Sequence, residues 1–164
     1  MDKQNELQAK EFIETVLIKE TERLVSEGFH HYAFVIMAQG LEILGSFLDT
    51  KPLKAQQQSK LRFSHAINRL MPFEYREINQ KHWLYDKLRA SMAHTFTSSR
   101  HLLLTSKNHP EFGKKHLKSH NDKLILVAED FFSAFKKACL RLIDGMDKGF
   151  VPQRKIESEF YYTF

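Results

Sequence analysis

The sequence is poor in residues that cross-link or interrupt a chain, with 1 Cys, 6 Gly and 4 Pro among 164 residues. A single Cys excludes a disulfide framework, and the low Gly and Pro content excludes collagen-like and low-complexity chains. No apolar leader run follows Met1, so we expect a cytoplasmic protein. The most apolar segment, 29–49, is short for a membrane span and contains Gln39, Glu42 and two Gly, so we expect no membrane helix.

Most enzyme signatures are also missing: there is no Gly-rich phosphate loop, no GxSxG, no paired Cys and no HExxH. The adjacent His30 and His31, and His116 with His120 four residues later, lack the further ligands that a metal site needs. We therefore predict no metal site and no cofactor. Cys139 falls on the apolar face of the last predicted helix and is interpreted as a core residue.

The residues that are present indicate one packed, mainly helical domain over residues 1–148. Apolar residues make up 42% of the chain and include 14 Phe. Their spacing, together with helix-stopping Gly and Pro residues, predicts helices over 3–27, 29–49, 59–70, 73–93 and 129–148.

The helical period stops between residues 101 and 127, where we expect a small insert with strand character. Short strands are predicted at 101–107, 115–119 and 123–127, the last two joined across Asn121-Asp122. The tail 149–164 carries Phe160, Tyr161, Tyr162 and Phe164. We expect this aromatic tail to dock on its own domain or on a neighbouring subunit.

The net charge of +5 is unevenly distributed along the chain. Residues 1–82 are neutral overall, whereas residues 87–123 hold eight basic side chains against two acidic ones. Such a cluster suits phosphates, although on charge alone a solvated Lys-rich loop without a ligand is the simpler interpretation. The candidate phosphate-binding or RNA-binding residues in and beside this segment are Lys87, Arg100, Lys114, Lys115 and Lys118.

Two features indicate where chemistry takes place. Glu42 is the only formal charge in an otherwise apolar helix, so it requires a cation partner or a position at the edge of the bundle. Arg89 and His94 lie off the core stripe of the fourth helix and converge only if that helix ends or distorts before His94. The residues 95–99 make such an ending plausible, and an Arg beside a His suits phosphate chemistry.

The segment Arg89-Ala90-Ser91-Met92-Ala93-His94 resembles the motif of the HEPN superfamily, an Arg followed four to six residues later by a His. The resemblance covers most of residues 1–148. It implies an all-α, up-and-down bundle of about five helices, with the insert near 101–127 as an addition. It also implies a homodimer in which the motif helices of two subunits meet.

Many members of this family are metal-independent endoribonucleases of bacterial defence or toxin-antitoxin systems, so the resemblance implies RNA and an antitoxin as partners. By this analogy His94 is a general acid or base, Arg89 binds the scissile phosphate, and Glu42, Ser91 and Thr95 support them. Active members often carry Asn or Asp where this chain has Ala90. That departure keeps open a non-catalytic dimeric scaffold with a structural Arg89–Glu42 pair, or a module that binds a nucleotide or another anionic ligand.

Overall fold

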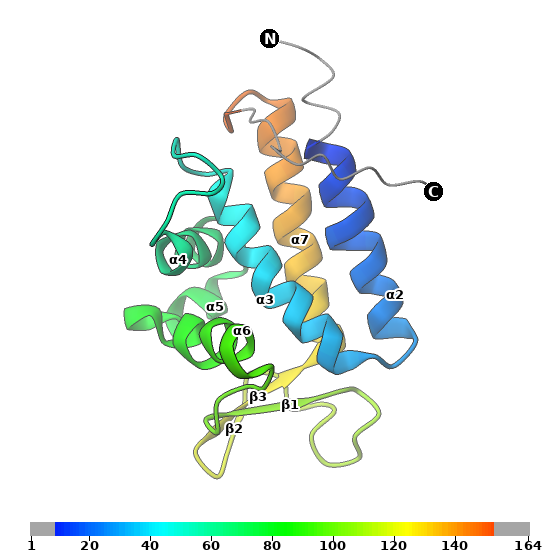
Figure 1. Cartoon of the computed structure of the whole chain (residues 1–164). Helices are drawn as coiled ribbons and strands as arrows, with labels where there is room; N and C mark the ends of the chain where they lie inside the picture. Colours follow the sequence, from blue (N-terminus) through cyan, green and yellow to red (C-terminus); the bar gives the residue numbers. More distant parts are fainter. Residues whose placement is uncertain (1–8, 153–164) are drawn as a thin grey trace.

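The computed structural model describes residues 9–152, which form a mainly helical fold with one small sheet (Figure 1). The aromatic residues of the tail, Phe160, Tyr161, Tyr162 and Phe164, lie outside the described residues, and so does the docking predicted for them. The helical elements are η1 (Ile13–Glu20), α2 (Thr21–Ser26), α3 (His30–Ser46), α4 (Ser59–Arg69), α5 (Phe73–Ile78), η2 (Gln80–His82), η3 (Tyr85–Ala90), α6 (Ser91–Thr95) and α7 (Ala128–Asp147). The strands are β1 (Leu102–Thr105), β2 (Ser119–His120) and β3 (Lys123–Val127).

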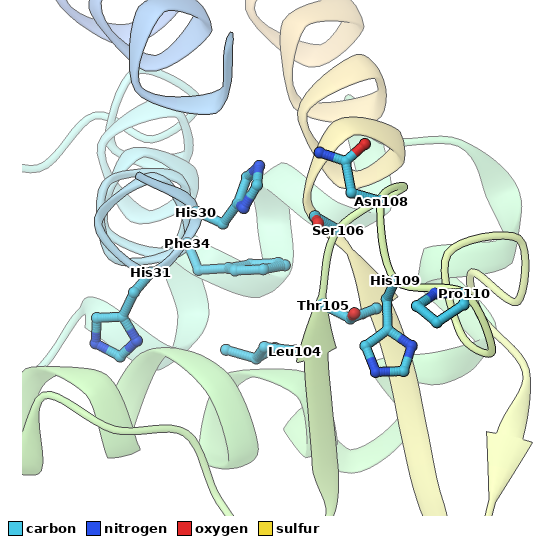
Figure 2. Close-up of a pocket in the computed structure, with 9 residues that line it drawn as sticks. All are labelled: His30, His31, Phe34, Leu104, Thr105, Ser106, Asn108, His109 and Pro110. Carbon is cyan, nitrogen blue, oxygen red and sulfur yellow. The ribbon is translucent and has the colours of Figure 1, made fainter. Parts of the chain in front are cut away.

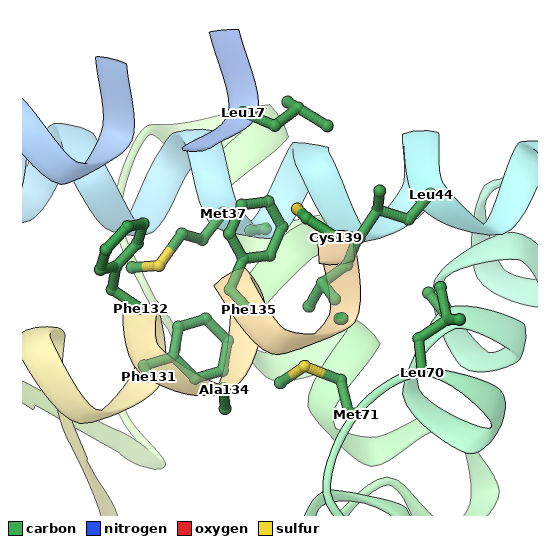
Figure 3. Close-up of a cluster of buried hydrophobic side chains, with 14 of the residues drawn as sticks. Leu17, Met37, Leu44, Leu70, Met71, Phe131, Phe132, Ala134, Phe135 and Cys139 are labelled. Carbon is green, nitrogen blue, oxygen red and sulfur yellow. The ribbon is translucent and has the colours of Figure 1, made fainter. Parts of the chain in front are cut away.

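Three long helical rods, formed by η1 with α2, by α3 and by α7, lie side by side, and α4, α5 and α6 cover the other side of α3 (Figure 1). The sheet lies across the end of the bundle where α3 begins. Aromatic and aliphatic side chains from these rods fill the core, among them Leu17, Met37 and Phe135, each at most 2% exposed (Figure 3). Within residues 9–152, no helix is both long enough and apolar enough to cross a membrane.

The predicted boundary between the first two helices, at Gly28, is confirmed. Gly28 has a left-handed backbone (φ 85°), and the N–H of Phe29 donates to the carbonyl of Leu24 over 2.8 Å. This arrangement closes one helix and turns the chain into α3, because glycine adopts positive φ without steric cost.

The C-terminal part of α3 approaches α4 so closely that only glycine fits between them. A Cβ placed on Gly45 would lie 1.8 Å from the carbonyl oxygen of Arg62, which is a backbone atom that cannot rotate away. Gly40 makes a similar approach to the ring of Phe135 on α7. These two glycines set the distances from α3 to α4 and to α7.

The predicted continuous helix over 73–93 is wrong, because the chain breaks between α5 and η3. Lys81 and His82 both have positive φ, which ends the helical path. Asn79 makes the break stable: its side-chain carbonyl accepts hydrogen bonds from the N–H groups of Leu84 and Tyr85, at 3.1 and 3.3 Å. The helical segment after His82 therefore starts in a new direction, and the Asn79 side chain caps its first turn.

The predicted insert contains a sheet in the order β1-β3-β2, with β1 parallel and β2 antiparallel to β3. The strand predicted over 123–127 is confirmed, whereas β2 covers only Ser119 and His120 rather than 115–119. The turn between β2 and β3 uses Asn121 and Asp122, both with positive φ, as a two-residue turn of this kind requires.

Candidate functional site

The Arg-to-His motif lies on η3 and α6, which run beside α3 (Figure 1). The apolar stripe of this segment is buried, with Leu88 fully buried and Met92 2% exposed. The wider turns of a π-helix form η3, and regular α-helical turns follow in α6. The segment ends at Phe96, whose left-handed backbone (φ 57°) stops the helix.

Arg89 points toward α3 and forms an ion pair with Glu42, with 2.5 Å between Nη2 and Oε2. Ser59, at the start of α4, donates a hydrogen bond to the other carboxylate oxygen of Glu42 over 2.7 Å. The side chains of Arg89 and Glu42 are only 15% and 21% exposed, and Arg89 Nε is buried without a hydrogen-bond partner in the described chain. Glu42 thus has the cation partner that its position in an apolar helix requires.

His94 is exposed, and its side chain makes no hydrogen bond or ion pair with the other residues of the described part. The helix does not end before His94, since α6 continues through Thr95, but the π-helical turns of η3 distort it up to Ala90. Arg89 is paired with Glu42 on α3, whereas His94 is exposed and unpaired within the described part of the chain, so the two side chains share no contact.

The two predicted supporting residues on this segment bond to nearby groups of the same segment. Ser91 Oγ donates to the carbonyl of Asp86 over 3.2 Å, and Thr95 Oγ1 donates to the carbonyl of Ser91 over 2.8 Å. Thr95 Oγ1 also lies 2.9 Å from Thr97 Oγ1. These contacts shape the helix end that presents His94.

Most of the basic residues in 87–123 have no acidic partner within the described chain. Arg89 is paired with Glu42, and Lys107 lies 3.2 Å from Asp130. The cations of this segment without a carboxylate partner among residues 9–152 are Lys87, Arg100, Lys114, Lys115, Lys118 and Lys123. The positive charge that the sequence concentrates here is therefore largely uncompensated locally, which favours contact with an anion.

An open hollow with a volume of about 480 Å³ lies between the start of α3 and the segment after β1 (Figure 2). His30, His31 and Phe34 line it from α3, and Thr105 to Pro110 supply most of the facing side. His31 also connects it to the motif helix, since its Nε2 donates a hydrogen bond to the carbonyl of Phe96 over 2.7 Å. The sequence offered one signal for this hollow, the adjacent His30 and His31.

Exposed aromatic rings lie beside His31, which lines the hollow. The rings of Tyr32 and Phe96 are 5.8 Å apart, and that of His31 lies 5.1 Å from Phe96. Tyr32 is 53% exposed and Phe96 is 48% exposed. Exposed aromatic side chains of this kind are surfaces on which unpaired bases stack.

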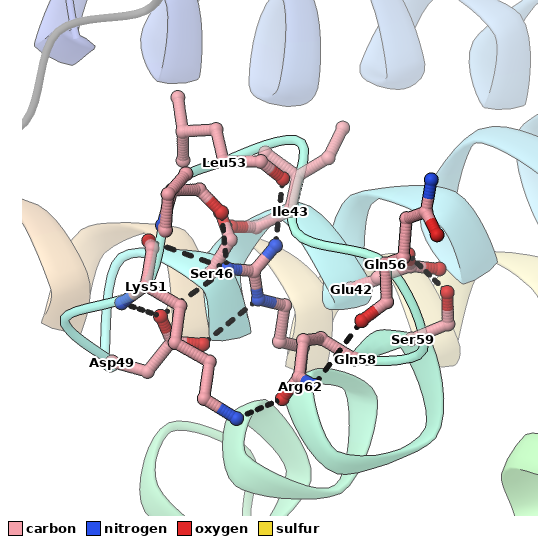
Figure 4. Close-up of polar contacts among 11 residues, drawn as sticks. Glu42, Ile43, Ser46, Asp49, Lys51, Leu53, Gln56, Gln58, Ser59 and Arg62 are labelled. Atoms are coloured by element: carbon pink, nitrogen blue, oxygen red, sulfur yellow. Dashed lines mark hydrogen bonds and ion pairs between the residues drawn. The ribbon is translucent and has the colours of Figure 1, made fainter.

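Arg62 is a buried residue that the sequence reasoning missed, although it is the only cation on the apolar side of its helix. It is 3% exposed and binds both carboxylate oxygens of Asp49, at 2.8 and 3.2 Å (Figure 4). It also donates to the carbonyls of Lys51, Pro52 and Leu53. All of these contacts hold the connection between α3 and α4, so the role of Arg62 is structural.

Two further candidate groups, the half-buried His116 and the buried Cys139, have no reactive partner in the described chain. His116 Nδ1 accepts the N–H of Val127 over 3.0 Å, and its Nε2 donates to Tyr75 Oη over 2.7 Å, so the ring is neutral. Burial lowers the pKa of His116, and it raises the pKa of the fully buried Cys139 thiol to about 12. No group of three or more His, Cys, Asp or Glu side chains in residues 9–152 is arranged to hold a metal ion.

The chain matches no protein-family model, no curated protein and no solved structure. The geometry at the end of the motif helix and the motif resemblance therefore carry the functional argument. That geometry consists of a fixed Arg89, an exposed His94, unpaired cations and an aromatic surface beside a hollow.

Proposed function

We propose that this chain is a HEPN-like protein that binds RNA as a homodimer and cleaves it without a metal ion. The observation that carries the proposal is the exposed His94, in the last turn of a helical segment whose Arg89 is paired with Glu42. An exposed imidazole without a structural partner is free to exchange protons with a ligand.

In the proposed reaction, the ribose 2′-oxygen attacks the adjacent phosphorus while His94 removes the 2′-hydroxyl proton. The bond between phosphorus and the 5′-oxygen breaks, and that oxygen receives the proton that His94 took up, which returns the imidazole to its starting state. The products are a 2′,3′-cyclic phosphate and a 5′-hydroxyl, so the atoms balance without an added water or metal. Arg89 stabilises the negative charge that develops on the phosphoryl oxygens.

We include a second copy because Arg89 of one chain is held against Glu42 on α3 and makes no contact with the exposed His94. A dimer that brings two motif helices together places His94 of one copy near Arg89 of the other. Glu42 then acts as a positioning residue, since an ion pair restricts the guanidinium to one orientation.

Uncompensated cations support RNA as the substrate. Lys87 and Arg100 lie just before and just after the exposed helix end in sequence, and Lys114, Lys115 and Lys118 lie in the insert. We propose that these residues steer the phosphate backbone toward His94. An RNA-cleaving protein of this kind fits a bacterial toxin-antitoxin or defence system, with an antitoxin as its protein partner.

The test is to incubate the protein with single-stranded RNA in EDTA and to analyse the ends of the products. Wild type should produce 2′,3′-cyclic phosphate and 5′-hydroxyl ends, and His94→Ala should lower the rate at least 100-fold because a general acid or base contributes about 10²–10⁴. His65→Ala, which removes an exposed His on α4, is the matched control and should cleave as wild type does. Equal rates for wild type and His94→Ala contradict the catalytic proposal.

The Glu42–Arg89 ion pair together with Ala90 favours a second candidate, a non-catalytic dimeric scaffold or anion-binding module. In this case the pair contributes to stability alone. Glu42→Gln separates the two candidates: in the nuclease it lowers the cleavage rate of a folded protein, whereas in the scaffold wild type leaves RNA intact and the substitution lowers only the melting temperature.

A further inference from the structure

We infer that the hollow between the start of α3 and residues 105–110 binds a nucleobase of the single-stranded RNA whose backbone lies at His94. The inference rests on the proposed function and adds to it the part of the substrate that the protein reads. It starts from the volume of about 480 Å³, which lies within the range of about 300–1,000 Å³ typical of small-ligand sites.

The imidazoles around the hollow are held by contacts within the protein. His31 donates to the carbonyl of Phe96 over 2.7 Å, and His30 Nε2 lies 3.6 Å from Glu129 Oε1. His109 Nδ1 accepts two backbone N–H groups at 3.2 Å, and its ring stacks on Phe112 with 4.8 Å between centroids. These contacts fix flat rings around the hollow before a ligand arrives, which lowers the cost of ordering them on binding.

Three hydrogen-bonding side chains in the hollow are not used by the described part of the chain. The hydroxyls of Thr105 and Ser106 and the amide of Asn108 make no hydrogen bond there (Figure 2). An amide that offers both a donor and an acceptor matches the edge of a base, as in the recognition of adenine by Asn or Gln. The hollow therefore contains ring faces for stacking and free polar groups for an edge.

The backbone of β1 adds two further polar groups. β1 is an edge strand, and the N–H of Leu124 on β3 donates to the carbonyl of His101 over 2.9 Å. Because the bonds of a parallel pair alternate along the strand, the N–H and C=O of Leu104 point away from β3. Leu104 itself lines the hollow.

The charge and position of the hollow fit an RNA strand. Its lining contains no acidic side chain, and the nearby carboxylate of Glu129 faces the imidazole of His30 at 3.6 Å. Phe96, to which His31 is bonded, follows His94 by two residues, and two residues span at most about 7 Å of chain. The exposed rings of Tyr32 and Phe96 lie on this path and can stack a base between the reacting phosphate and the hollow.

The test measures the affinity of the full chain for a fluorescent eight-nucleotide RNA and for the same ribose-phosphate chain without bases. All variants carry His94→Ala so that the probe stays intact. Asn108→Ala combined with Thr105→Val should weaken binding of the RNA about tenfold and leave binding of the abasic chain unchanged. Asn68→Ala, an exposed Asn on α4, is the matched control and should change neither affinity.

Two results would overturn the inference: an unchanged RNA affinity in the double variant, or an equal loss for the abasic chain. Adenosine monophosphate bound as tightly as the RNA would also overturn it, because the site would then serve a free nucleotide. Thermal melting shows that each variant is folded. Base-dependent binding without any RNA cleavage by wild type supports the base-binding hollow and contradicts the nuclease. RNA cleavage together with base-independent binding supports the nuclease and contradicts the base-binding hollow.

Discussion

The two ends of α3 differ in what they do with charged and polar side chains. At the C-terminal end, Glu42 pairs with Arg89, and the closely packed α4 carries the buried Arg62, which binds Asp49. At the N-terminal end, the exposed Tyr32 and the bonded but accessible His31 border an open hollow.

This difference indicates that the C-terminal end of α3 holds the fold together and the N-terminal end faces a ligand. Buried charges held in ion pairs make a site costly to change, whereas exposed rings and unused hydrogen-bonding groups contribute little to stability. The motif segment contacts both ends of α3. Arg89 pairs with Glu42 near the C-terminal end, and Phe96, two residues after His94, accepts a hydrogen bond from His31 at the N-terminal end.

The largest expected effect is at the C-terminal end, on replacement of Arg62 by Met. The change removes five hydrogen bonds and leaves Asp49 without the guanidinium, so the free energy of unfolding should fall by about 3–5 kcal/mol. Urea unfolding followed by circular dichroism measures the loss. Arg69→Met, an exposed Arg on the same helix, should change stability by less than about 0.5 kcal/mol.

A smaller effect is expected from the Glu42–Arg89 pair, which is less buried than Arg62. Glu42→Gln and Arg89→Met should each lower stability by about 2–3 kcal/mol, and the double variant should lose less than the two losses added together. The exposed pair Lys60 and Asp86, 3.2 Å apart, is the control and should contribute less than about 1 kcal/mol. Strictly additive losses at Glu42 and Arg89 contradict the coupling.

The smallest effect concerns the attachment of the sheet to α5 through His116 and Tyr75. Burial lowers the pKa of His116 in the folded protein, so below about pH 6.5 the unfolded chain binds more protons than the folded one. The stabilising contribution of neutral His116 is thus complete above this pH and is lost as the pH falls toward the folded-state pKa. Melting temperatures between pH 7.5 and 5.5 should fall more steeply for wild type than for His116→Gln.

The exposed His65 provides the control for this pH dependence. His65→Gln should retain the wild-type slope, because its ring is exposed on α4 rather than placed in the Tyr75 and Val127 contacts. Equal slopes for wild type and His116→Gln would show that other groups cause the acid sensitivity.

The sequence was sufficient for features that depend on local periodicity. The helices that became α3, α4 and α7, the stop at Gly28, the strand over 123–127 and the burial of Cys139 were predicted from apolar spacing and turn residues. The prediction failed in 73–93, where the apolar period continues across a break that depends on a side chain. Asn79 caps the second helix from a buried position that periodicity does not reveal.

The candidate site was predictable only in part, for the same reason. Glu42 and Arg89 stood out because a lone charge in an apolar helix needs a partner, and the structure pairs them. The hollow depends on residues more than 70 positions apart, such as His31 and Asn108, which no local pattern brings together. The structural role of Arg62 likewise depends on the path of the loop that it holds.

The most direct test of this division of roles is amide hydrogen exchange of His94→Ala in the presence and absence of single-stranded RNA. The RNA should protect peptides from the start of α3, the end of α6 and residues 105–110, and leave the exchange of 42–62 unchanged. Protection confined to 42–62, or no protection anywhere, would contradict the assignment of the N-terminal end of α3 to RNA.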